Sequence, residues 1–137
     1  IRHNMAYVAK VLDQESVPAG RRDGPPLVFA GYTQGTAMAY RAAAGAGRAC
    51  RGVIALGGDV PPELADGALS GLPVALIGRG SRDEWYTEEK LAQDLETLQS
   101  QGVSCRPARF EGGHEWTDGF RAMVGRFLAG LRPDFED

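Results

Sequence analysis

The chain has 137 residues, the length of one domain, and its 43% hydrophobic and 24% charged residues are typical of an ordinary globular protein. The net charge of -3 and the scattered basic residues, nearly all arginine, argue against a nucleic-acid partner. No apolar run approaches the roughly 18 residues that span a membrane. Because the first residues lack a secretory h-region, we expect a cytoplasmic protein, and because the chain begins with Ile1, we expect its native amino terminus further upstream.

The spacing of apolar residues predicts one helix followed by four strand-helix or strand-loop units. Met5, Val8 and Leu12 lie at helical spacing and predict an amphipathic first helix. Short apolar runs bounded by glycine or proline predict strands at residues 27–30, 52–57, 73–78 and 103–110. Helical patterns predict further helices at residues 36–44, 87–101 and 117–131, with one isolated turn at 63–64.

Individual residues sharpen these expectations. Pro107 cannot donate to a strand ladder, so the fourth strand should lie at an edge of the sheet. Thr87 is a predicted N-cap, with carboxylates following it in the first helical turn. The last helix should bury Phe120, Val124, Phe127, Leu128 and Leu131.

Strands that are apolar throughout and alternate with helices predict an α/β fold, a parallel sheet covered on both faces. There are no internal repeats or linkers, so we expect a single domain over residues 1–137 with about four strands. Cys50 and Cys105 are too few for a disulfide framework, and no Cys/His spacing indicates a metal site, so both should be free thiols.

The stretch from Leu27 to Ala43 is the most informative part of the sequence. It predicts a buried strand, a tight Gly-Tyr-Thr-Gln-Gly turn and an Ala-rich helix. This is the order of a nucleophile elbow, G-x-S-x-G, with Thr33 at the central position. The sharp turn should require small flanking residues, which accounts for Gly31 and Gly35. It would hold the Thr33 hydroxyl at the carboxyl end of the sheet, where ligands bind in open α/β folds.

A nucleophilic hydroxyl needs a base, and the chain offers two histidines. His3 precedes the first helix and is best explained as a solvated terminal residue. His114 lies between two glycines and Glu115, just past the fourth predicted strand. That is the place and chain order of the base in an elbow-type hydrolase.

The base needs an orienting acid, which should follow the third strand. Asp83 occupies that loop, with the adjacent Glu84 as the second candidate and Asp59, after the second strand, as the third. Thr33, Asp83 and His114 then follow the order nucleophile, acid, histidine.

These motifs together resemble the phospholipase/carboxylesterase, acyl-protein thioesterase-like branch of the α/β-hydrolases. GYTQGTAMA is similar to the GFSQGG elbow of that branch, residues 74–85 to its acid-bearing strand and loop, and GGHEW to its histidine loop. The resemblance implies a three-layer α/β-hydrolase-type sheet that corresponds to the carboxyl-terminal half of the family fold. It also implies hydrolysis of carboxylic esters or thioesters through an acyl-enzyme, without a cofactor. Thr33, Asp83 and His114 fall at the catalytic positions.

One departure from the family is that its first strands, and the loop that supplies one oxyanion donor, have no counterpart here. The Gln34 N–H is therefore the only oxyanion donor that can be named. The strand at Leu27–Ala30 would be left as an apolar edge, which is an aggregation hazard unless something pairs with it. We therefore expect a homodimer across that edge, or an amino-terminal segment that completes the sheet.

The other departure is Thr33 itself. A β-branched residue is an outlier at positive φ, and its methyl group crowds an approaching carbonyl. An active threonine hydrolase, a slowed variant and a pseudoenzyme that binds an acyl ligand or a partner chain all remain open. Tyr32 and the loop residues Trp85 and Trp116 are candidate substrate contacts, although packing would explain each of them equally well.

Overall fold

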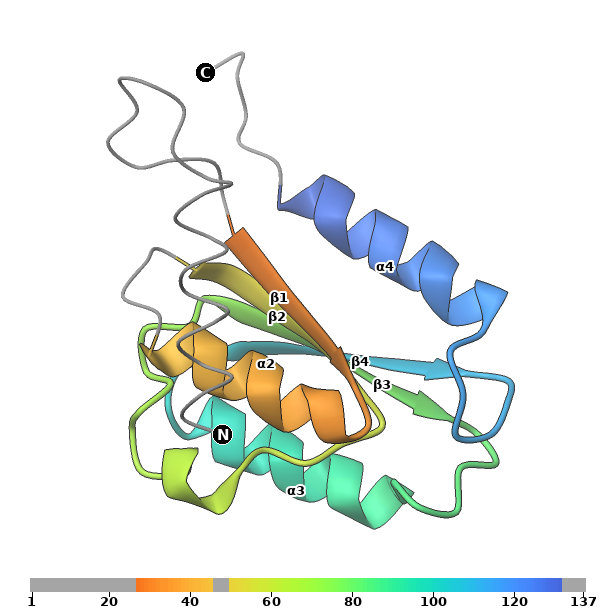
Figure 1. Ribbon diagram of the computed structural model, residues 1–137, viewed down its shortest axis with the longest axis horizontal. Coiled ribbons are helices and arrows are strands. Elements are labelled where there is room, and N and C mark those ends of the chain that lie inside the picture. The colour runs from red at the N-terminus through yellow and green to blue at the C-terminus, as the bar shows by residue number, and fades with distance from the viewer. Residues whose placement is uncertain (1–26, 46–49, 132–137) are drawn as a thin grey trace.

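Four parallel strands form a sheet in the computed structural model, which describes residues 27–45 and 50–131 (Figure 1). The predicted first helix and His3 lie outside these residues. The strands lie side by side in chain order: β1 (Leu27–Tyr32), β2 (Cys50–Leu56), β3 (Val74–Gly80) and β4 (Ser104–Phe110). Between and after them come α2 (Gln34–Gly45), the short 3₁₀ turn η1 (Pro62–Leu64), α3 (Glu88–Gln99) and α4 (Asp118–Gly130).

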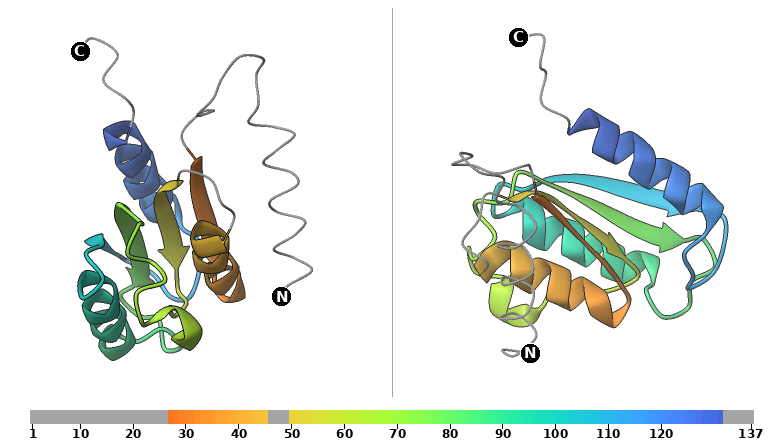
Figure 2. Two further views of the ribbon diagram at one scale, coloured as in Figure 1. Left: turned by 90° about the vertical axis from the view of Figure 1, so that its left-hand side faces the viewer. Right: turned by 45° about the horizontal axis from the view of Figure 1, so that its top comes forward.

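Helices cover both faces of this sheet (Figures 1 and 2). Residues of α2 and α3, such as Tyr40 and Leu91, pack with Ala55 and Ile77 of the central strands in one apolar core. Phe120 and Phe127 of α4 belong to a second core on the opposite face. The predicted three-layer arrangement with a parallel sheet is therefore confirmed.

The positions of the strands follow from their residues. Most of β2 and nearly all of β3 are buried, as their unbroken apolar runs predict. β4 lies at one edge of the sheet and contains Pro107, opposite Ile77 of β3. Proline has no N–H to donate to a further strand, so an edge position suits it. Among the described residues β1 pairs only with β2, so it forms the other edge.

α3 begins after its predicted N-cap Thr87, and α4 begins after Thr117, the predicted start of the last helix. The Thr87 hydroxyl accepts a hydrogen bond from the Lys90 N–H (3.3 Å), and the Thr117 hydroxyl accepts one from the Phe120 N–H (3.0 Å). The expected burial of Leu128 is wrong, because this side chain is 41% exposed. It lies about 100° around α4 from the buried Phe127, outside the face that meets the sheet. No helix among the described residues is long and apolar enough to cross a membrane.

The turn between β1 and α2 brings Gly31 against the first turn of the helix. A Cβ atom on Gly31 would lie 2.1 Å from the carbonyl oxygen of Gly35. A Cβ atom on Gly35 would meet nothing within 4 Å, so the expectation that both glycines must be small is wrong for Gly35. The close approach is one-sided because a Cβ atom would point toward the backbone of the other glycine only from Gly31.

These two glycines form a matched pair for a stability measurement. Gly31→Ala should lower the free energy of unfolding by about 3 kcal/mol or more, because backbone must move to admit the methyl group. Gly35→Ala should leave stability unchanged or raise it by up to about 1 kcal/mol, because alanine favours the helix. Urea unfolding followed by circular dichroism measures both. Equal effects of the two substitutions would contradict the one-sided contact.

The β1 edge is the basis of a prediction about assembly. Its residues are at most half-buried, and Ala30 is exposed. We expect this chain to form a homodimer through β1, or to pair there with an amino-terminal segment. Ala30→Lys should weaken a dimer, because a charged side chain on an edge strand opposes pairing. Ser104→Lys on the β4 edge is the control, and light scattering that shows a monodisperse monomer would contradict the homodimer.

Candidate active site

Thr33 occupies the apex of the turn after β1. It is the only residue other than glycine with positive φ (51°) within residues 27–45 and 50–131. Its N–H donates to the Leu56 carbonyl (2.8 Å), and its carbonyl accepts from the N–H (3.1 Å) and the hydroxyl (2.8 Å) of Thr36. These bonds tie the turn to the carboxyl end of β2 and to the first turn of α2. The backbone geometry is thus that of a nucleophile elbow.

The candidate base and the candidate acid come together from two loops that are far apart in sequence. His114 Nδ1 lies 2.8 Å from Asp83 Oδ2. The other oxygen, Oδ1, accepts hydrogen bonds from the Trp85 N–H (2.8 Å) and the Tyr86 N–H (2.9 Å). Asp83 is only 3% exposed. Its carboxylate is held in place by these three hydrogen-bond partners. Its geometry is that of an acid that orients a catalytic histidine.

The charge state of Asp83 suits that role. Burial alone would raise the pKa of Asp83, but the hydrogen bonds from the Tyr86 N–H, the His114 ring and the Trp85 N–H together hold it below its ordinary value. The carboxylate is therefore ionised at neutral pH and can stabilise a positively charged His114. The two alternative acids, Glu84 and Asp59, are exposed, and neither bonds to His114.

The histidine loop is anchored to the elbow and to the acid loop. The Tyr32 hydroxyl donates to the His114 carbonyl (2.7 Å), and the two rings lie 5.5 Å apart between centroids. The Arg82 N–H donates to the Gly112 carbonyl (2.7 Å). Tyr32 therefore lies behind the histidine and holds its backbone, one residue before the elbow apex.

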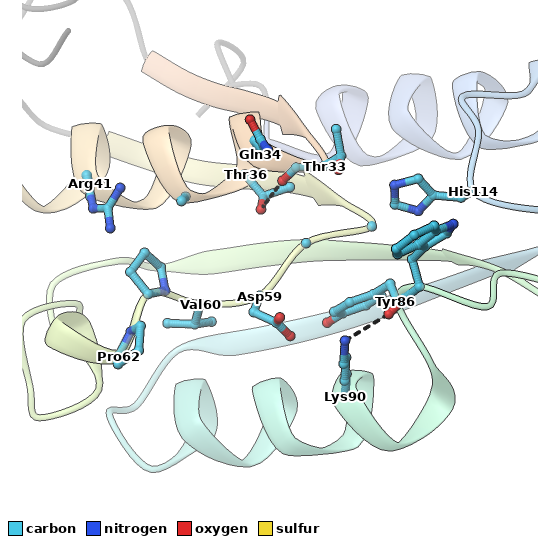
Figure 3. A pocket seen from close by; sticks show the side chains of 15 residues that line it. Thr33, Gln34, Thr36, Arg41, Asp59, Val60, Pro62, Tyr86, Lys90 and His114 are labelled. Atoms are coloured by element: carbon cyan, nitrogen blue, oxygen red, sulfur yellow. Dashed lines mark hydrogen bonds between the residues drawn. The ribbon is translucent and has the colours of Figure 1, made fainter. Parts of the chain in front are cut away.

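An open cavity of about 640 Å³ lies in front of these residues (Figure 3). Thr33 and His114 contribute to its wall at one end, and Arg41 and Pro62 at the other. Trp85, 74% exposed, also lines it. Tyr32 and Trp116 are not among its lining residues. Trp116 packs edge-on against Phe120, with ring centroids 4.9 Å apart, on the α4 side of the sheet.

Gln34 is the first residue of α2 and also lines the cavity. The first N–H groups of a helix have no partner within it, so the Gln34 N–H remains the candidate donor to an oxyanion in this cavity. The nearby Thr36 N–H is already bonded to the Thr33 carbonyl. In the part of the chain that the structure describes, no hydrogen bond joins the Thr33 hydroxyl to His114. Hydrogen bonds between a nucleophile and its base are often long before substrate binds.

Two neighbouring glycines after β2 matter more than the sequence indicates. A Cβ atom on Gly57, where φ is 71°, would lie 2.9 Å from His114 Cε1. One on Gly58 would lie 2.0 Å from the Thr36 hydroxyl oxygen. In the sequence, this glycine pair indicates only the end of a strand. The groups that approach it come from Thr36 and His114, which are distant in the chain.

The comparisons with known proteins concern the fold. Neither a protein-family model nor a curated protein sequence matches the chain. Acyl-protein thioesterase 2 from Zea mays matches with a TM-score of 0.68 and 21% identity, over 93% of this chain and 62% of that one. A variant of SOBER1 from Arabidopsis thaliana matches with a TM-score of 0.73 and 21% identity, over 93% of this chain and 62% of that one. Esterase PE8 matches with a TM-score of 0.73 and 20% identity, over 93% of this chain and 58% of that one.

This chain has the α/β-hydrolase fold. It spans between 58% and 62% of the length of those three structures. Identities near one in five establish the fold and leave the activity to be argued from the site.

The strain at Thr33 can be measured without any substrate. Thr33→Ala and Thr33→Gly both remove the hydroxyl, but only glycine adopts positive φ without a Cβ clash. We expect Thr33→Gly to be about 1 kcal/mol more stable to urea than Thr33→Ala. In the helical control, Ala43→Gly should instead lower stability by about 1 kcal/mol. Thr33→Gly that is less stable than Thr33→Ala would contradict the strained turn.

Proposed function

We propose that this chain hydrolyses carboxylic esters or thioesters through an acyl-enzyme on Thr33. The observation that carries the proposal is the buried Asp83 carboxylate bonded to His114, at the mouth of a cavity that Thr33 also lines. Esterases and an acyl-protein thioesterase among the solved structures share the fold, which is consistent with this chemistry.

In the first half of the reaction the Thr33 hydroxyl attacks the carbonyl carbon while His114 accepts its proton. Asp83 stabilises the resulting imidazolium through Nδ1, and the Gln34 N–H donates to the carbonyl oxygen as it becomes negative. The bond to the leaving group then breaks, and His114 returns the proton to the departing alcohol or thiol. The acyl group remains as an ester of Thr33.

In the second half a water molecule replaces the leaving group. His114 accepts a proton from the water, whose oxygen attacks the acyl carbon of the Thr33 ester. The carbon–oxygen bond to Thr33 breaks, the hydroxyl regains a proton from His114, and the acid is released. All proton transfers use the same imidazole, so no metal or redox cofactor enters the scheme.

The cavity wall favours an apolar acyl group. Away from His114 its apolar lining residues are Ala37, Val60, Pro61 and Pro62, with Trp85 on the loop that carries Asp83. The charged residues Arg41, Asp59 and Lys90 also line it. One side of the wall follows α2 from Gln34 to Arg41. At a rise of about 1.5 Å per residue, these seven steps along the helix span about 10 Å. Short to medium apolar acyl chains fit this length better than long ones.

A second candidate function is binding of an acyl ligand with little or no turnover. It is favoured by the β-branched residue at positive φ, whose methyl group restricts the hydroxyl rotamer and crowds the carbonyl approach. With Gln34 as the only assigned oxyanion donor, the rate would also be lower, because one missing donor typically costs about 10²–10³ in rate.

Hydrolysis of p-nitrophenyl acetate and butyrate by four proteins separates these functions. If the chain is an esterase, the wild type turns over, Thr33→Ala falls to background, and His114→Ala loses about 10²–10⁴ in kcat. A silent wild type with an active Thr33→Ser shows an elbow disabled by the threonine. Silence in both, with all variants folded by circular dichroism, rejects the hydrolase and favours binding.

A further inference from the structure

Asp94 is a carboxylate on the buried face of a helix. It lies on α3 between Leu91 and Leu98, both fully buried, and is itself only 6% exposed. A buried charge is unfavourable unless it is paired or hydrogen-bonded, so its partners are informative. The catalytic scheme above does not use it.

Both oxygens of Asp94 accept hydrogen bonds from residues that line the cavity. Oδ2 accepts from the Tyr86 hydroxyl (2.5 Å), and Oδ1 accepts from the Val60 N–H (3.3 Å). Val60 belongs to the loop after β2 and Tyr86 to the loop after β3. A single carboxylate therefore connects two walls of the cavity.

Each of these walls contacts the catalytic residues. Tyr86, whose phenol bonds to Asp94, also donates its backbone N–H to Asp83. The loop that leads to Val60 starts at Gly57, where the backbone packs against the His114 ring. A change at Asp94 would thus reach the acid through one loop and the base through the other.

Other titratable groups also surround Asp94. Burial, and next the charge of Asp94, raise the pKa of Tyr40 in α2, whose buried hydroxyl has no hydrogen-bond partner among the described residues. Lys90 of α3 and Asp59 of the loop after β2 contribute opposite charges. Burial raises the pKa of Asp94 to about 6, although the hydrogen bonds from Tyr86 and Val60 lower it in part.

We propose that Asp94 is a positioning residue that joins the loops after β2 and β3, most firmly when it carries a proton, and so holds the cavity and Asp83 in their working geometry. This role rests on the proposed hydrolase function. Asp94 touches neither substrate nor the reacting atoms, and it acts through Tyr86 and Val60.

Protonation strengthens the clamp and keeps the same partners. A proton on Oδ2 can be donated to the Tyr86 oxygen, while Oδ1 still accepts from the Val60 N–H. Burial raises the pKa of Asp94 to about 6, so the buried site favours the neutral form and the loops are held less firmly above about pH 6. Asp94→Asn mimics this neutral state, because an amide can donate to Tyr86 and accept from Val60.

The first test is the ratio of kcat/KM between wild type and Asp94→Asn, measured on p-nitrophenyl butyrate from pH 5 to 8. Taking the ratio cancels pH effects that the two proteins share. We expect a ratio near 1 at pH 5 that falls to about 0.1–0.2 by pH 7.5, with a midpoint near 6, because only the wild type acquires a buried charge. Glu96→Gln, a matched loss of charge on the exposed face of α3, should give a ratio near 1 throughout.

The second test needs no enzyme activity. The backbone amide signals of Val60 and Tyr86 should titrate in nuclear magnetic resonance spectra with the same midpoint, and this titration should be absent in Asp94→Asn. The hydrogen bond from the Tyr86 hydroxyl lowers the pKa of Asp94. Tyr86→Phe removes only this hydroxyl, so the midpoint of the Val60 amide titration should move to higher pH.

A pH-independent activity ratio, or amide signals that titrate equally in Asp94→Asn, would overturn the proposal. If wild type is inactive, the ratio is measured in a Thr33→Ser background. If that is also inactive, the hydrolase function has failed, and the amide titration alone decides whether Asp94 joins the two loops. If Asp94→Asn does not fold, Tyr86→Phe decides by whether the Val60 midpoint moves.

Discussion

The left-handed turn at Thr33 is the constraint on which the rest of this structure depends. It reverses the chain between β1 and α2 so sharply that Gly31 can carry no side chain, and it leaves the Thr33 hydroxyl beyond the carboxyl end of the sheet. The hydrogen bond from Thr33 N–H to Leu56 fixes this turn to β2, which is buried on both faces. A strained backbone persists there because the surrounding core holds it.

A parallel sheet explains why residues from four distant segments meet at that turn. The carboxyl ends of β1 to β4 lie at one edge of the sheet, so the loops that follow them converge. Thr33 comes from the first, Val60 from the second, Asp83 from the third and His114 from the fourth. Cross-loop contacts, such as that of Tyr32 with the His114 backbone, then set distances that the sheet alone leaves open.

Much of this arrangement could be predicted because it depends on local patterns. Apolar runs gave the strands, Pro107 gave the edge position of β4, and Thr87 and Thr117 gave helix starts. The errors have the same origin. Leu128 fits a helical apolar pattern yet faces solvent, because the width of the buried stripe depends on the surface beneath the helix.

The sequence by itself determined the α/β fold, the turn around Thr33 and the chain order of Thr33, Asp83 and His114, because these follow from periodicity and short motifs. Only the tertiary structure decided which acid bonds to His114, that Gly31 but not Gly35 is constrained, and that Asp94 joins two loops. The bonds of Asp83 with His114 and of Asp94 with Val60 join residues more than 30 positions apart, and no local pattern encodes their geometry.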